Sequence, residues 1–149
     1  MARRHIVRPV PLAALAAALA FGAGAHAQPP SASGTIAPSG ADSRVQPLLT
    51  QPLPDIEGKE VSMAVIEYAP GAASPAHRHH ANVFVYVLEG SVVMQVRGGE
   101  ETTLTAGQTF YESPADVHTV SRNASATEPA KFLVFFVKDE GAPTAAAAD

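Results

Sequence analysis

The stretch that decides the fold is GAASPAHRHHANVFVYVLEG, residues 71–90. It carries the run His77-Arg78-His79-His80, continues into an apolar segment and ends on a Glu-Gly turn. In an extended chain, side chains two positions apart project from the same face. His77 and His79 can therefore converge on one point while Arg78 and His80 point away. Two converging imidazoles are typical of a metal site.

A metal site needs at least one more ligand from elsewhere in the chain. The one histidine after residue 80 is His118, which lies in a strand-like pattern with Val117 and Val120. Cysteine is absent, so any metal is held by nitrogen or oxygen. These positions make His77, His79 and His118 candidate ligands of a divalent ion. The residues alone leave a second interpretation open, in which the first two lie in a solvated loop and His118 is a core histidine.

Short strands separated by turn residues fill the region between residues 60 and 139. Their apolar residues alternate or run continuously over four to eight positions, and Gly or Pro pairs interrupt them. No window shows a sustained helical period with caps. The predicted strands are Val61–Tyr68, Val83–Leu88, Val92–Val96, Thr102–Thr105, Thr109–Tyr111, Val117–Ser121 and Lys131–Lys138. This number of short strands predicts an all-β barrel or sandwich.

Two segments resemble the paired motifs of the cupin superfamily. The first is Gly71-x5-His77-x-His79 followed by the apolar run that ends at Gly90, and the second runs from Gly107 to His118 with Pro114 between them. The resemblance covers roughly residues 60–138. It implies a small antiparallel double-stranded β-helix, a jelly-roll-like barrel. It also implies that the histidines of both motifs hold one metal ion inside the barrel.

The sequence departs from the first cupin motif at one ligand. The family usually places a glutamate four residues after the second histidine, where this chain has Val83. Our first expectation is an open coordination position filled by water or substrate, and the second is Glu112 as the fourth ligand. Asn82 and Gln95 are further candidates. Three neutral imidazoles would leave the charge of a divalent ion uncompensated and attract an anion. Fe, Zn, Mn, Ni and Cu all remain compatible with histidine ligands.

Polar side chains on the strands are candidates for orienting a small-molecule ligand. Tyr86, Tyr111 and Gln95 are candidates for lining the pocket, although for each of the two tyrosines we favour core packing with the hydroxyl at the rim. The strands Phe84–Leu88 and Phe132–Val137 are apolar on both faces and need cover on both. A single barrel leaves its outer wall uncovered, so we expect a homodimer.

The two ends of the chain differ in composition from the predicted barrel. Residues 1–27 combine a basic start, an Ala- and Leu-rich run and Ala25-His26-Ala27, which predicts a signal peptide cleaved after Ala27. Cleavage would leave no membrane anchor, and the protein would be periplasmic or secreted. Arg3-Arg4 leaves a twin-arginine route open. We expect residues 28–44 to be a disordered linker, 45–140 the cupin domain and 141–149 a disordered tail.

Charge and site chemistry limit the function. The leader holds three of the ten Lys and Arg, so seven basic residues face 14 acidic ones and the mature charge is −7. Nucleic-acid binding is not expected. The main hypothesis is a metal-dependent enzyme, a dioxygenase or a lyase or isomerase, acting on a small oxygenated or anionic compound. The alternative is a non-catalytic periplasmic protein that binds a small molecule or metal.

Overall fold

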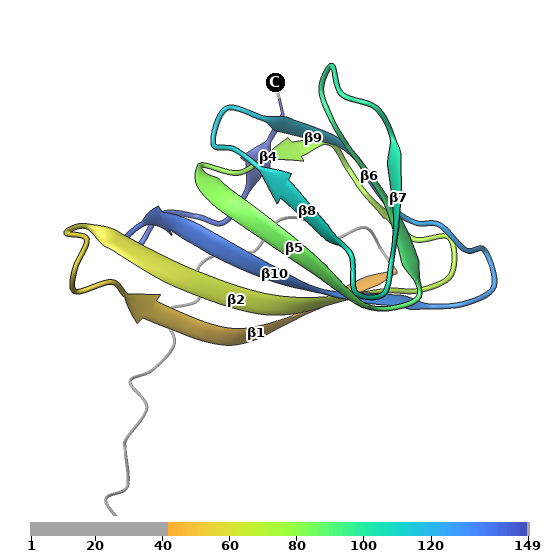
Figure 1. The fold of residues 1–149 in the computed structure, drawn as a ribbon, viewed down its shortest axis with the longest axis horizontal. Helices are drawn as coiled ribbons and strands as arrows, with labels where there is room; N and C mark the ends of the chain where they lie inside the picture. The colour runs from red at the N-terminus through yellow and green to blue at the C-terminus, as the bar shows by residue number, and fades with distance from the viewer. Residues whose placement is uncertain (1–41, 149) are drawn as a thin grey trace, which may run out of the picture. The chain divides into compact units, whose positions relative to one another are not determined.

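A computed structural model describes residues 42–148 as two antiparallel β-sheets that face each other. One sheet has the order β1-β2-β10-β5-β8, and the other has the order β11-β4-β9-β6-β7 with β3 also paired to β9. Figure 1 shows β1, β2, β10, β5 and β8 side by side, with β9, β6 and β7 in a second layer. The strands are β1 (Ser43–Pro52), β2 (Lys59–Tyr68), β3 (Ala73–Ser74), β4 (His77–Arg78), β5 (Ala81–Glu89), β6 (Ser91–Val96), β7 (Thr102–Thr105), β8 (Thr109–Glu112), β9 (Val117–Asn123), β10 (Ala130–Asp139) and β11 (Ala146–Ala147).

The predicted all-β double-stranded β-helix is confirmed, and each of the seven predicted strands coincides with a strand. Strand β1 was not among them. It lies at the edge of its sheet, most of its residues are exposed, and it contains Pro47 and Pro52. An edge strand tolerates proline because one of its sides needs no hydrogen bonds. Because most residues of β1 are exposed, the strand also lacks the apolar alternation by which a buried strand is identified.

Strict alternation of side chains places the core between the sheets. In β5 the buried residues are Val83, Val85 and Val87, whereas Phe84 and Tyr86 between them are exposed. In β10 the inward residues from Phe132 to Phe136 follow the same rule. From the opposite sheet, β6 contributes Val92 and Met94. These side chains form one apolar cluster, whose burial is the main stabilising contribution to a domain without disulfides.

Residues 141–148 are ordered, whereas the sequence predicted a disordered tail over residues 141–149; residue 149 lies outside the described residues. Ala146 and Ala147 form β11, which pairs with β4 at the edge of the second sheet. Lys138 is buried, and its Nζ donates to Glu60 and to the carbonyl of Ala142, which fixes the start of the segment. The barrel thus extends past residue 140. Backbone pairing of this kind needs no apolar side chains, which is why composition did not indicate it.

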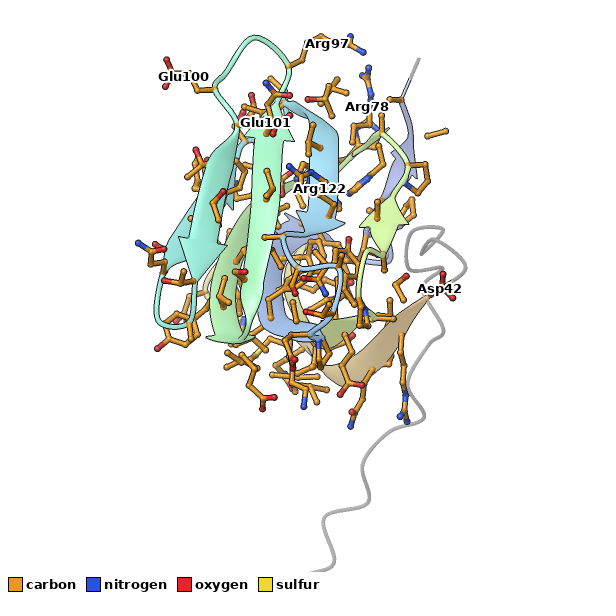
Figure 2. All side chains as sticks on the ribbon, turned by 90° about the vertical axis from the view of Figure 1, so that its right-hand side faces the viewer. Asp42, Arg78, Arg97, Glu100, Glu101 and Arg122 are labelled. Atoms are coloured by element: carbon orange, nitrogen blue, oxygen red, sulfur yellow. The ribbon has the colours of Figure 1, made fainter. Side chains whose placement is uncertain are left out.

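The outer faces of the two sheets differ in polarity. On the five-stranded sheet, Leu49, Met63, Phe135, Phe84 and Tyr111 stand opposite one another in register across all five strands. The outer face of the second sheet is polar. Figure 2 shows Arg122 on that face, and its Nη2 lies 3.4 Å from a carboxylate oxygen of Glu101. Only the five-stranded sheet therefore exposes a continuous apolar row.

The leader lies outside the described residues, as do residues 28–41 of the expected linker. Residues 42–148 contain no helix with the length and apolar composition that crossing a membrane requires. Strand β1 begins at Ser43, two residues before the expected start of the domain.

The turn between β5 and β6 depends on Gly90, and its replacement is predicted to destabilise the fold. Gly90 has φ of 69°, and a Cβ there would lie 2.4 Å from the carbonyl oxygen of Pro129. Gly107, with φ of 89° and no atom within 4 Å of such a Cβ, is the matched control. Gly107→Ala carries only the backbone penalty of roughly 1–2 kcal/mol. Gly90→Ala should lower the free energy of unfolding clearly further, measured by urea denaturation. Equal losses would refute this role of Pro129.

Candidate metal site

Two short segments bring the three predicted histidines together. His77 lies in β4 directly opposite His118 of β9, and their ring centroids are 5.1 Å apart. His79 follows β4 by one residue, and its ring lies 4.7 Å from that of His77. All three are buried, whereas His80 is exposed. One ligand atom from each histidine falls within 4.8 Å of the others. The predicted convergence of His77, His79 and His118 is confirmed.

A β-bulge aims His118 at this site. Val120 pairs with Gln95, but the next pair along is His118 with Val96, so Thr119 is an extra residue on β9. Ser121 faces the interior, and simple alternation would have turned His118, three positions away, to the outside. The bulge reverses this parity, and both side chains line the same cavity.

Each histidine of β4 has one ring nitrogen held by a backbone carbonyl. His77 Nδ1 donates to the oxygen of Pro75 at 2.8 Å, and His79 Nδ1 donates to the oxygen of Thr144. The remaining nitrogens, His77 Nε2 and His79 Nε2, face each other at 3.1 Å. Burial lowers the pKa of both rings below the usual value, so at neutral pH they are uncharged and each Nε2 offers a lone pair.

Glu112 is the acidic group of the site. It is 2% exposed, and its Oε1 lies 3.2 Å from His118 Nδ1, while its Oε2 lies 3.9 Å from His79 Nε2. It occupies the last position of β8, directly opposite Val83 of β5. The carboxylate missing at Val83 is therefore supplied by the neighbouring strand. The carboxylate of Glu112 would offset part of the charge of a bound divalent ion, which three neutral imidazoles alone would leave uncompensated.

The histidines line a small cavity of about 40 Å³ between the sheets. This is room for roughly three water molecules. Most of the wall is apolar, with Val85, Met94 and Phe136 among its residues, and Thr144 of the C-terminal segment also lines it. Glu112 is the only lining residue with a carboxylate, and no lysine or arginine is among those that line it.

A hydroxyl cluster on the cavity wall was not expected from the sequence. The hydroxyl of Tyr68 lies 2.6 Å from Ser74 Oγ and 2.8 Å from Ser121 Oγ. Burial raises the pKa of Tyr68, which keeps the phenol protonated. The alternation of Val61, Met63 and Val65 with Ala64, Ile66 and Tyr68 placed Tyr68 in a strand, but only cross-strand pairing shows that it reaches the two serines.

The residues expected to orient a ligand do not line this cavity. Tyr86 and Tyr111 are 45% and 51% exposed on the outer face of the five-stranded sheet. The hydroxyl of Tyr111 donates to Asn82 Oδ1 at 2.7 Å, so Asn82 is also directed away from the metal site. Gln95 donates to the carbonyl of Gly99 in the β6–β7 hairpin. Adjacent residues of a strand face opposite sides. Because Glu112 and Val85 face inward, their neighbours Tyr111 and Tyr86 cannot.

The donor set fits a divalent metal ion. Two nitrogens bound at about 2.1 Å to one ion lie roughly 3.0–3.4 Å apart, which matches the two facing Nε2 atoms of His77 and His79. His118 Nε2 is buried and makes no hydrogen bond, a costly state for a polar atom unless a ligand uses its lone pair. Glu112, a carboxylate buried beside the three histidines, also favours a cation. These residues could hold the metal, while nothing in their chemistry selects its identity.

Comparison with known proteins gives relatives that are similar in sequence. Beta-alanine degradation protein BauB of Pseudomonas aeruginosa is 33% identical over 91 residues, which are 60% of this chain and 90% of that protein. Rhicadhesin receptor of Pisum sativum is 34% identical over 91 residues, 58% of this chain. The chain spans about two fifths of the pea protein, since the match covers 41% of it.

A solved structure and a family match complete the comparison. An oxalate oxidase in complex with the substrate analogue glycolate superposes with a TM-score of 0.54 and 24% identity, over 73% of this chain and 55% of that one. At this identity the likeness shows the fold alone. Residues 64–136, which include all three histidines and Glu112, match the family described as the cupin domain. The chain belongs to the cupin family.

Proposed function

We propose that this protein is an exported, metal-dependent cupin enzyme acting on a small oxygenated or anionic compound. The observation that carries the proposal is the buried cluster of His77, His79 and His118 on the wall of an otherwise mostly apolar cavity. A divalent ion held there would polarise a bound oxygen and lower the pKa of a bound water. The sequence supports the export part through the leader at residues 1–27.

The size of the cavity favours a small substrate, and we propose that it is a small acid whose oxygen binds at the ion. About 40 Å³ accommodates only a few heavy atoms, so a flavonol-sized compound would need the walls to open. The name of one compared protein points in the same direction, because β-alanine is a small carboxylic acid. We propose that the substrate binds through an oxygen at the histidine cluster while Tyr68 and Ser121 hydrogen-bond its other end.

The reaction class is either dioxygenation or a lyase or isomerase reaction without oxygen. Metal-loaded protein should be incubated with a panel of small hydroxy acids, amino acids and diketones, with oxygen consumption and product mass measured together. Product with oxygen uptake indicates dioxygenation, and product without it indicates a lyase or isomerase. Saturable binding without turnover across the panel would favour the alternative of a periplasmic binding protein.

The three-histidine site predicts stoichiometric metal. Purified protein should contain about one divalent ion per chain, measured by inductively coupled plasma mass spectrometry. His79→Ala should reduce the content below roughly one tenth, because a site with three protein ligands loses most of its affinity when one of them is removed. His80→Ala is the matched control, since His80 is adjacent but exposed and should retain the ion. Equal metal content in both variants would overturn the assignment.

The C-terminal segment is predicted to be required for tight metal binding. The carbonyl of Thr144 holds His79 Nδ1, and β11 covers the edge of β4. Deleting residues 142–149 removes both contacts and should weaken metal affinity by about 10-fold, the usual effect of losing a partner of a ligand. Deleting only residues 148–149, which lie beyond β11, should have no such effect. Competition titration with a chromogenic chelator measures the metal affinity of both truncated variants. Identical affinities of the two variants would contradict the prediction.

We also propose that two copies associate through the apolar outer face of the five-stranded sheet. Three of its rings, Phe84, Tyr86 and Tyr111, are each about half exposed. Together these residues leave roughly 300 Å² of surface in water, which is comparable to the largest apolar patch of a typical soluble monomer, and such patches are often functional. A second copy supplies the same apolar row through a two-fold axis, as most homo-oligomers do.

Multi-angle light scattering after size-exclusion chromatography tests this association. The wild-type protein should elute with the mass of two chains, and Phe84→Glu should reduce it to one because a charge would be buried in the interface. Thr103→Glu, an exposed substitution on the polar second sheet, is the control and should stay dimeric. A wild-type protein with the mass of one chain would refute the proposal.

A further inference from the structure

The hydrogen bonds of the site indicate which nitrogen of each histidine bears its proton. A backbone carbonyl can only accept, so the contacts with Pro75 and Thr144 place hydrogen on Nδ1 of His77 and of His79. Their Nε2 atoms then carry lone pairs that meet at 3.1 Å. In both cases a fixed acceptor behind the ring orients it toward the centre of the site.

His118 repeats this arrangement with a side chain in place of a carbonyl. Its Nδ1 lies 3.2 Å from Glu112 Oε1, an oxygen that can accept from it. Its Nε2 is buried without a hydrogen-bond partner, as a nitrogen reserved for a metal would be. The ligand atoms of the three histidines all lie within 4.8 Å of one another, and Glu112, whose Oε2 is 3.9 Å from His79 Nε2, is not in that group.

We propose that Glu112 is a positioning residue that accepts a hydrogen bond from His118 Nδ1, and that it is not the fourth metal ligand. This inference rests on the proposed metal function. It makes Glu112 the third member of a set of Nδ1 acceptors with Pro75 and Thr144. The carboxylate stands opposite Val83, so it replaces the family's glutamate as a negative charge near the ion without replacing it as a ligand.

This role has a consequence for the site. A carboxylate behind a metal-binding imidazole fixes its tautomer and strengthens it as a donor. The ion would then have three imidazole ligands, and its remaining positions would be open to water and substrate. The adjacent negative charge offsets part of the ion's charge, so an anionic substrate would be bound less tightly than by three neutral imidazoles alone.

Two variants separate positioning from coordination. Glu112→Gln retains a side-chain oxygen that can accept from His118 Nδ1, so metal affinity should stay within about threefold of wild type. Glu112→Ala removes the acceptor and should weaken affinity by about 10- to 100-fold. The electron paramagnetic resonance spectrum of the Cu(II)-loaded protein should be unchanged by Glu112→Gln. If Gln and Ala variants lose affinity equally and the Gln spectrum changes, Glu112 is a ligand and the proposal fails.

A measurement without metal keeps this test independent of the proposed function. Long-range ¹H–¹⁵N correlation spectra of metal-free protein report the tautomer of each histidine. His118 should be in the Nδ1–H form in wild type and in Glu112→Gln, and should shift toward a mixture in Glu112→Ala. An Nε2–H tautomer of His118 in the wild-type protein would overturn the inference even if metal binds. Absence of metal binding with the predicted tautomers would overturn the proposed function alone.

Discussion

The pairing of β4 with β9 is the interaction on which the site depends. β4 has only two residues, yet it sets His77 directly opposite His118 and is itself held between β9 and β11. Without this pairing the segment around His77 would be a loop, and its imidazoles would have no fixed geometry. A metal site needs its ligand atoms placed to within a fraction of an ångström, and backbone hydrogen bonds on both sides of a strand supply that constraint.

Burial makes the polar groups of the site interdependent. Three imidazoles and a carboxylate lie inside an apolar wall, where an unpaired polar atom costs about 1–3 kcal/mol. The carbonyls of Pro75 and Thr144 accept from Nδ1 of His77 and of His79, and Glu112 Oε1 at the end of β8 lies 3.2 Å from His118 Nδ1. His77 Nε2 and His79 Nε2 face each other, and His118 Nε2 is buried without a hydrogen bond. With the Nδ1 atoms donating away from the centre of the site, the Nε2 lone pairs remain available to bind a cation.

The outer surfaces of the two sheets differ in polarity. The second sheet carries two of the three histidines on its strands and has a polar exterior, with Arg122 paired to Glu101. The five-stranded sheet supplies most of the apolar wall, and its exterior row from Leu49 to Tyr111 is apolar as well. A sheet that is apolar on both faces is stable in water only if something covers the second face. The proposed association through that row would complete the fold without altering the cavity.

Features that depend on neighbouring residues in the sequence could be predicted, and features that depend on distant residues could not. The fold class and the strands from Val61 to Lys138 follow from alternation and turn residues, which are local properties. The three histidines were identified from a two-residue spacing and from the scarcity of other candidates. Tyr86 was misplaced because β5 is apolar on both faces, so its alternation does not say which face is inside. Tyr111 could have been excluded once Glu112 was considered, since neighbours in a strand point apart.

What the sequence by itself determined is therefore the barrel and the identity of three ligand candidates. The tertiary structure decided the rest: the bulge at Thr119 that turns His118 inward, the C-terminal segment whose Thr144 carbonyl accepts from His79, and the position of Glu112 across from Val83. Each of these depends on register, meaning which residue of one strand stands opposite which residue of another. Register is set by packing and turn geometry over the whole sheet, and a shift of one residue reverses every side chain. No local pattern in the sequence encodes it.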